Sequence, residues 1–339
     1  MQTKLVVSSS PFLRDASVST RRLMGDVVIA LIPTALAAIW FFGAPALALM
    51  LVSVVFAVLS ELVYEKITHQ KTTIDDLSAV VTGLLLAFNL PANAPWWMAA
   101  IGSIIAIVLV KQMFGGIGQN FINPALAART ILMLSWAGLI AATALPAGGQ
   151  LFGLTTVPVD AVASATPLVS SSYSLWQIFI GDVPGMLGET CKLTLILGGV
   201  YLIVRKVIDW RIPVFFIATA FILFWIQTGV IYSVESGTDN ALYQILSGGL
   251  LLGAFFMATD YVTSPVSKWG KVVMGIGCAV ILFVIRAYNN SYPEGCSFAI
   301  LFMNVLTPLI DKWTMPRTFG AVKPAKAKKS EAKQGGAKA

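Results

Sequence analysis

The chain has 339 residues, of which 57% are hydrophobic and only 12% are charged. Soluble domains carry about 25% charged residues, so the composition excludes an ordinary soluble protein and indicates an integral membrane protein. The net charge of +7 comes from the segments between apolar runs and from the C-terminal tail, and it therefore indicates contact with anionic lipid headgroups rather than with nucleic acid.

Repeated apolar runs approach the ~20 residues that a helix needs to cross a bilayer. They predict an all-α polytopic membrane protein with about ten transmembrane helices in one domain, residues 1–320. An even number of spans places both termini on the same side. We expect the spans at 24–42, 44–63, 77–90, 95–113, 123–144, 192–207, 213–233, 242–258, 270–288 and 296–310.

Basic residues predict which side that is, because Lys and Arg are retained in cytoplasmic loops. With ten spans, all 23 Lys and Arg residues except Lys192 and Arg286 fall on the side of the termini, Arg129 among them. Both termini are therefore expected in the cytoplasm. The first span follows Arg21 and Arg22 without a cleavage site and is expected to stay in the chain. Residues 321–339 have no apolar period and predict a disordered basic cytoplasmic tail.

The three cysteines, Cys191, Cys278 and Cys296, are too few for the usual four-thiolate iron–sulfur site. We expect them to be small buried side chains, with a cluster shared with a partner protein as the alternative. The single histidine, His69, has no ligand partners nearby, and we predict no metal site.

No acidic residue is clearly at the bilayer centre, where a carboxylate would mark an ion path. We expect interfacial pairs instead, Asp26 with Arg22, and Glu61 and Glu65 with Lys66.

A weak internal repeat relates residues 83–88 to residues 249–255, and a Pro-bearing polar turn follows each. Two halves of five spans run in opposite senses, which is the inverted-repeat plan of many transporters, with broken helices meeting near a binding site. The amides Asn89, Asn120, Asn123 and Asn304 suggest a polar pocket between the halves for a flat ring such as a flavin or quinone. The alternative is that they only tie helices together.

The expected extracytoplasmic loop at 145–191 is the one long connection outside the membrane, and long loops carry function. Its segment 174–180 is apolar enough to lie along the membrane surface, with Trp176 at headgroup depth. The same loop contains Thr166 in a run of small residues, which by composition alone favours a structural loop.

The run Asp160-Ala161-Val162-Ala163-Ser164-Ala165-Thr166 resembles the covalent flavinylation motif Asp-x-x-Ser/Thr-x-Ala-Thr. Further blocks along nearly the whole chain resemble one family, that of RnfD, a membrane component of the Rnf ion-translocating electron-transport complex, and of NqrB, its relative in the Na⁺-pumping NADH:quinone oxidoreductase. The modest length favours the Rnf member. These blocks are residues 8–11, 84–91 with Trp96-Trp97, 111–124, 166–168, 253–260 and 292–311.

The resemblance implies that Thr166 carries FMN through a phosphodiester bond, and that Asp160, Ser164 and Ala165 are part of the motif. It implies a flavin transferase that uses FAD and Mg²⁺ outside the cytoplasm. Ala163 stands where the motif has Ser or Thr, which predicts slower modification. A second, noncovalently bound flavin such as riboflavin is expected in the pocket that contains Asn89, Asn120 and Asn123.

By the same resemblance, the chain is a component of the bacterial inner membrane that assembles with RnfA, RnfB, RnfC, RnfE and RnfG. It relays electrons between ferredoxin and NAD⁺ as Na⁺ or H⁺ moves across the membrane, and it is not catalytic alone. Two other interpretations stay open: a small-solute transporter or channel, and a non-redox membrane anchor with an unmodified Thr166.

Overall fold

The computed structural model describes residues 19–141, 143, 146, 167–168, 173–231, 240–288 and 294–315. These residues are helical and contain no β-strand. The first part holds α1 (Thr20–Phe42), α2 (Ala44–Ile67), the 3₁₀ turn η1 (Ile74–Asp76), α3 (Ser78–Phe88), α4 (Trp96–Ile104), the π-helix η2 (Ile105–Gln112), α5 (Pro124–Ser135) and α6 (Ala137–Ala141).

The second part holds α7 (Leu175–Ile180), α8 (Lys192–Val204), α9 (Arg211–Thr228), α10 (Ala241–Leu246), α11 (Leu250–Leu252), the π-helix η3 (Gly253–Met257), α12 (Lys268–Tyr288) and α13 (Cys296–Thr314). Each predicted span overlaps one of these helices or a run of them. The predicted tail at 321–339 lies outside the described residues, and so does the part of the predicted loop 145–191 that contains Thr166.

Four helices, α1, α2, α9 and α12, are long and apolar enough to cross a bilayer, and several shorter apolar helices pack among them. Their outward faces carry large apolar side chains such as Leu36, Leu51 and Ile226, which are 61%, 57% and 74% exposed. Apolar surface on this scale needs an apolar surrounding. The protein is a multi-pass membrane protein.

Helices α5 and α7 begin with side-chain caps that their sequences supply. Asn123 precedes α5, and its Oδ1 atom accepts from the N–H groups of Ala125 and Leu126, with Pro124 at the first helical position. Ser174 and Gln177 form a capping box at the start of α7. Such caps satisfy the free N–H groups of the first turn, so the start of each helix is fixed locally.

The third and eighth predicted spans are interrupted in the structure. The α3 helix ends at Phe88, and the backbone that follows is bonded by a distant segment: the N–H groups of Leu187 and Gly188 donate to the carbonyls of Leu90 and Phe88 at 3.0 and 2.9 Å. A Cβ atom on Gly188 would lie 2.2 Å from the Cβ atom of Phe88, so only glycine permits this approach. An unwound backbone inside a membrane protein needs such partners.

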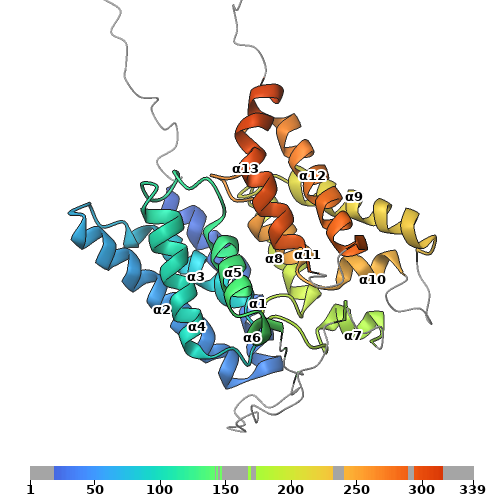
Figure 1. Cartoon of the computed structure of the whole chain (residues 1–339), viewed down its shortest axis with the longest axis horizontal. Coiled ribbons are helices and arrows are strands. Elements are labelled where there is room, and N and C mark those ends of the chain that lie inside the picture. The colour runs from blue at the N-terminus through green and yellow to red at the C-terminus, as the bar shows by residue number, and fades with distance from the viewer. Residues whose placement is uncertain are drawn as a thin grey trace, which may run out of the picture.

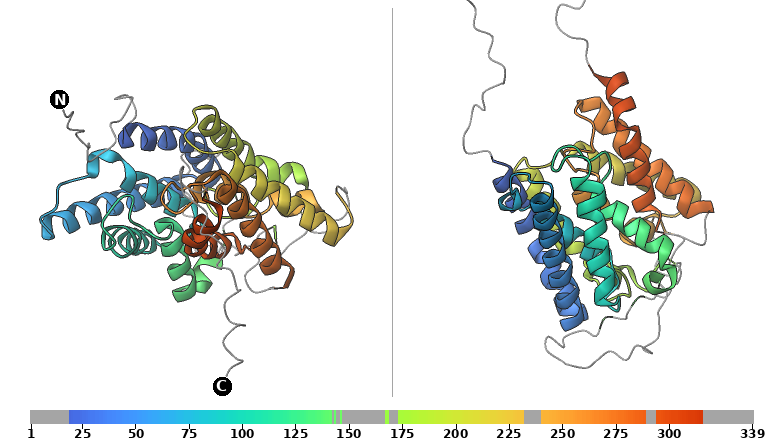
Figure 2. Two further views of the ribbon diagram at one scale, coloured as in Figure 1. Left: turned by 90° about the horizontal axis from the view of Figure 1, so that it is seen from above. Right: turned by 60° about the vertical axis from the view of Figure 1, so that its left-hand side comes forward.

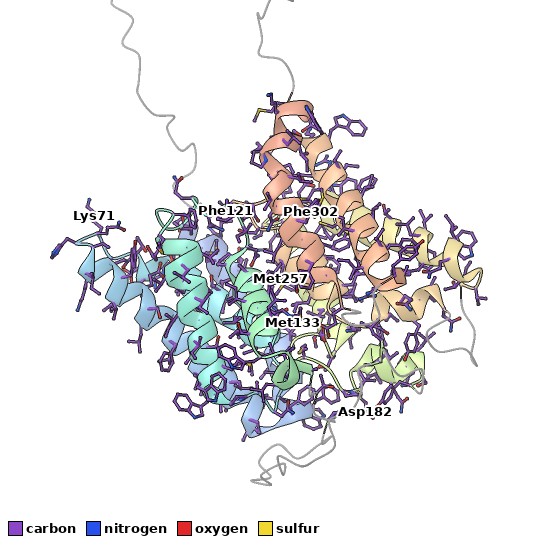
Figure 3. The ribbon with its side chains drawn as sticks, in the orientation of Figure 1. Lys71, Phe121, Met133, Asp182, Met257 and Phe302 are labelled. Carbon is purple, nitrogen blue, oxygen red and sulfur yellow. The ribbon has the colours of Figure 1, made fainter. Side chains whose placement is uncertain are left out.

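Helix packing follows the same scheme in the two parts of the chain. In the first, α2 packs on α3 and α4; in the second, α9 packs on α10, η3 and α12. The two parts meet where α1 contacts α8 and where α5 contacts α13, and Figures 1 and 2 show them side by side. In Figure 3, Lys71 and Phe121 lie toward one end of the bundle and Asp182 toward the other.

Candidate functional site

The ends of α3 and η3, which come from different halves of the chain, meet inside the bundle. The Nδ2 atom of Asn89, just after α3, donates to the carbonyl of Leu85 at 2.6 Å and lies 3.7 Å from Sδ of Met257, the last residue of η3. Both residues are buried, and Figure 3 places Met257 in the middle of the molecule. The two interrupted spans therefore form one junction.

Two further amides join the same junction. The Nδ2 atom of Asn123 donates to the carbonyl of Met257 at 3.3 Å. The side-chain oxygen of Asn304, on α13, accepts from the backbone N–H of Asn123 at 3.2 Å when its amide is oriented to satisfy both of its ends. The hydrogen-bonding capacity of Asn89, Asn123 and Asn304 is thus used in joining helices.

A cavity of about 390 Å³ opens beside this junction. Its wall is formed by parts of α1, α3, α5 and η3, by the connections at 117–123 and 259–262, and by Leu202 and Ile208. Of the three amides predicted for a pocket, Asn120 and Asn123 line this cavity, whereas Asn89 is not part of its wall. Most of the lining is apolar, and Ser78, Thr82, Lys111 and Asp260 are among its further polar groups. The size falls within the range of about 300–1,000 Å³ of small-molecule sites.

Arg129 is the centre of a second buried cluster, on the other side of Asn89. Its Nη1 atom donates to Oδ1 of Asn89 at 3.0 Å and to Oγ of Ser297 at 2.8 Å, and its Nη2 atom forms an ion pair with Glu294. The side chain is 4% exposed. The prediction that Arg129 belongs with the cytoplasmic cations is wrong, because this arginine lies inside the bundle and pairs across the two halves.

Lys192 and Arg286, the two basic residues predicted outside the cytoplasm, lie next to that cluster. Lys192 donates to the carbonyls of Glu189 and, at 3.0 Å, Gly248. Arg286 donates to the carbonyls of Gln244 and, at 3.1 Å, Ser247. The carbonyls of Gln244, Ser247 and Gly248 belong to the end of α10 and the break before α11, which would otherwise leave acceptors without donors. The two cations therefore hold the interrupted eighth span.

The residues that follow Thr166 are held at the same break. The hydroxyl of Tyr243, on α10, donates to the carbonyl of Pro167 at 3.1 Å. A Cβ atom on Gly248 would lie 2.9 Å from Cδ1 of Leu168 and 3.1 Å from Nη2 of Arg286, and the φ angle of Gly248 is +68°. The motif residues Asp160, Ala163, Ser164, Ala165 and Thr166 lie outside the described residues. Their sequence neighbours Pro167 and Leu168 pack against α10.

The acidic residues at the other end of the bundle have different partners from those predicted. Oε1 of Glu61 forms an ion pair with Nζ of Lys111 at 2.7 Å, not with Lys66, and also accepts from Nε2 of Gln112 at 2.8 Å. Glu65 accepts from the backbone N–H of Thr73. The reason is that residues far apart in sequence meet when η2 packs on α2.

Asp26 likewise has its ion pair across the two halves. Its Oδ2 atom lies 3.2 Å from Nη2 of Arg205, at the end of α8, and Tyr201 donates to its Oδ1 atom. The predicted pair with Arg22, one helical turn away, is replaced by this longer-range pair because α1 packs directly on α8.

The cysteines are free and buried, as predicted for small apolar side chains. Among the described residues, no group of three or more His, Cys, Asp or Glu side chains could hold a metal ion. Trp176 on α7 is 68% exposed. Its contact with the membrane surface stays a prediction.

The sequence did not single out Glu189, Tyr243 or Glu294 as site residues. The sequence does hold a signal for the cluster: Arg129 and Arg286 are charged residues within predicted spans, and a charge in that position normally faces the bundle interior and has a partner.

Comparisons with known proteins agree with the resemblance. The family described as NQR2, RnfD, RnfE matches residues 6–320. The chain is 45% identical over 339 residues to the D subunit of the Na(+)-translocating ferredoxin:NAD(+) oxidoreductase complex of Acetobacterium woodii, covering 97% of this chain and 99% of the relative. It is 40% identical over 331 residues to the D subunit of the proton-translocating ferredoxin:NAD(+) oxidoreductase complex of Clostridium ljungdahlii, covering 93% and 96%.

The D subunit of an ion-translocating oxidoreductase complex of Escherichia coli is 33% identical over 350 residues, with 93% of this chain and 98% of the relative covered. The chain belongs to the NQR2, RnfD and RnfE family.

Proposed function

We propose that this chain is the D subunit of an ion-translocating ferredoxin:NAD⁺ oxidoreductase complex, and that it carries FMN on Thr166. The observation that carries the proposal is the flavinylation-like run ending at Thr166 in a chain that is 45% identical, over 97% of its length, to the D subunit of such a complex. A bound flavin supplies electron transfer, and the protein supplies its placement.

The residues next to the motif are suited to that placement. Tyr243 holds the carbonyl of Pro167, and Leu168 packs beside Gly248. Lys192 and Arg286 are close to the same break, and their positive charge favours the phosphodiester anion that the modification would create. A covalent link next to the contacts of Pro167 and Leu168 would keep the flavin at a high local concentration there without tight noncovalent affinity.

Maturation requires a flavin transferase. The hydroxyl oxygen of Thr166 forms a bond to the phosphorus of the FMN half of FAD, the pyrophosphate bond breaks, and AMP leaves. Ala163 removes one hydroxyl from the motif, and we expect Ala163→Ser to be flavinylated faster than the natural chain. A time course with purified transferase and FAD measures this. Equal rates would show that the hydroxyl at this position does not help recognition.

The cavity beside Asn120 and Asn123 is the proposed site of a second, noncovalent flavin such as riboflavin. Its volume of about 390 Å³ and its mostly apolar wall with a few polar groups fit a flat heterocycle. Asn123 caps α5 and bonds Met257. The Nδ2 atom of Asn120 donates to the carbonyl of Ile122 at 3.1 Å, so we expect the side-chain oxygen of Asn120 to contact the ring.

Ten spans in two inverted five-helix halves are the proposed topology. It is supported by the packing of α2 on α4 and of α9 on α12, and by the pairing of α1 with α8 and of α5 with α13. We propose cytoplasmic termini in a bacterial inner membrane, with the loop that contains Thr166 outside. Arg129 is buried in the bundle and does not count toward either side, and the remaining basic residues still favour this orientation.

The proposed partners are RnfA, RnfB, RnfC, RnfE and RnfG and the lipid bilayer.

The FMN proposal is tested by the intact mass and in-gel fluorescence of the membrane-expressed chain in cells that contain the transferase. We expect a flavin-phosphate adduct that disappears in Thr166→Val and persists in the matched loop variant Thr155→Val. An unmodified natural chain, under conditions that modify a known flavinylated protein, would overturn the FMN proposal and favour a non-redox anchor.

A further inference from the structure

Glu189 is a buried carboxyl group for which the described residues provide no ion pair. The residue is 4% exposed, and its Oε1 atom accepts one hydrogen bond, from the backbone N–H of Met186 at 3.2 Å. The neighbouring ammonium group of Lys192 bonds the backbone carbonyls of Glu189 and Gly248, not the carboxyl group. A carboxyl group removed from water, with one N–H donor and no contacting cation, favours its neutral form.

Glu294 lies beside it and has a buried carboxyl oxygen that lacks a hydrogen-bond donor in the part of the chain that the structure describes. Its Oε2 atom is held by the guanidinium group of Arg129, but its Oε1 atom is buried without a hydrogen-bond partner among the described residues. Both carboxyl groups lie beside the guanidinium group of Arg129, Glu294 in its ion pair and Glu189 next to the backbone of Gly249, which also approaches Arg129. A neutral Glu189 has one O–H donor that needs an acceptor, and Glu294 has one buried acceptor that needs a donor.

We propose that Glu189 and Glu294 together form a proton-binding site. Glu189 carries the proton and donates it to Oε1 of Glu294, whose Oε2 atom stays in its ion pair with Arg129. The site is independent of any flavin, because each of its contacts is made by the chain itself.

The groups that face this pair come from four helices. Arg129 lies on α5, Lys192 at the start of α8, Arg286 on α12 and Cys296 at the start of α13. Burial raises the pKa of Glu189 to about 7, and the charge of Glu294 acts in the same direction, whereas Arg129 and Lys192 act to lower it. The proton is therefore held below neutral pH and is released as the pH rises through about 7.

A glycine at position 249 leaves space for the carboxyl group of Glu189. A Cβ atom on Gly249 would lie 2.8 Å from Oε2 of Glu189 and 4.0 Å from Nη1 of Arg129. Glycine at the break before α11 thus leaves the space through which the carboxyl group of Glu189 reaches the Arg129 cluster. The segment before α8 is fixed at the same time, because Leu187 and Gly188 bond the backbone after α3.

Infrared difference spectroscopy of the purified complex across neutral pH tests the proposal. We expect a carbonyl-stretch band of a protonated carboxyl group that decreases as the pH rises through about 7 and is lost in Glu189→Gln. Asp209→Asn is the matched control, because Asp209 forms ion pairs with Arg211 and Lys271 and carries no proton.

A second variant keeps the test decisive if Glu189→Gln does not assemble. In Glu294→Gln the guanidinium group of Arg129 loses its carboxylate and becomes available to Glu189, so the band should titrate at lower pH. A band that is unchanged in both variants, or absent from the natural complex over the whole pH range, would show that the pair is not a proton site.

Discussion

Glu61 and Lys111 form an ion pair with 2.7 Å between Oε1 and Nζ, and their side chains are 0% and 4% exposed. This contact joins α2 to the end of the π-helix η2, and Ser78, at the start of α3, accepts from the same ammonium group at 2.6 Å. Three helices of the first half thus share one buried charge pair beside the cavity.

Glu61→Gln should lower the free energy of unfolding by about 3–5 kcal/mol, because it leaves the ammonium group of Lys111 buried without its counter-charge. Glu61→Gln combined with Lys111→Met should recover most of this loss. Thermal unfolding of the purified protein in detergent measures both. If the double variant is as unstable as Glu61→Gln alone, the loss arises from packing and not from the uncompensated charge.

Gly248→Ala should destabilise the protein more than Gly229→Ala. Both glycines have left-handed φ angles, +68° and +70°, so each substitution carries a similar backbone cost of about 1–2 kcal/mol. At Gly248 the new Cβ atom would crowd the side chains of Leu168 and Arg286. At Gly229 it would meet nothing within 4 Å. The difference in apparent melting temperature between the two variants measures the effect of the crowding. Equal decreases in melting temperature would show that Leu168 does not pack tightly against Gly248.

Tyr243→Phe should loosen the chain after the flavinylation motif. The substitution removes a buried hydrogen bond to the carbonyl of Pro167, worth about 1 kcal/mol, and keeps the ring. Hydrogen exchange should become faster in the peptide that contains Leu168. Tyr288→Phe is the control, because Tyr288 is 83% exposed; similar exchange in both variants would mean that the hydroxyl of Tyr243 does not hold the segment.

The stability of the natural protein relative to Glu189→Gln should decrease as the pH rises from about 5 to about 8. Burial raises the pKa of Glu189 from 4.5 to about 7, so between these values the folded protein holds a proton that the unfolded chain has lost. Unfolding then releases a proton, and a higher pH favours it. Apparent melting temperatures at a fixed scan rate measure the difference.

Asp209→Asn should show the opposite trend. Partial burial acts to raise the pKa of Asp209, but the hydrogen bonds and charges of Arg211 and Lys271 outweigh this and lower it. The stabilisation that Asp209 provides is therefore lost as the pH falls. The same trend in both variants would indicate a general effect of pH on the fold.

The sequence by itself determined the class of the protein, the positions of its helical segments and its family. Runs of apolar residues near span length leave a chain few alternatives to membrane helices, and caps such as Asn123 and Ser174 fix helix starts within one turn. The motif at Thr166 could also be recognised, because a short contiguous run carries it.

Only the tertiary structure decided which charges meet. Asp26 pairs with Arg205, Glu61 with Lys111, and Arg129 with Glu294, where sequence proximity had suggested Arg22, Lys66 and a cytoplasmic loop. Inside a bundle a charge pairs with whatever the packing of distant helices brings within contact, since leaving it unpaired in a medium of low dielectric constant costs more than any local preference. The same packing made Asn89 a partner of Arg129 and left Asn120 on the cavity wall.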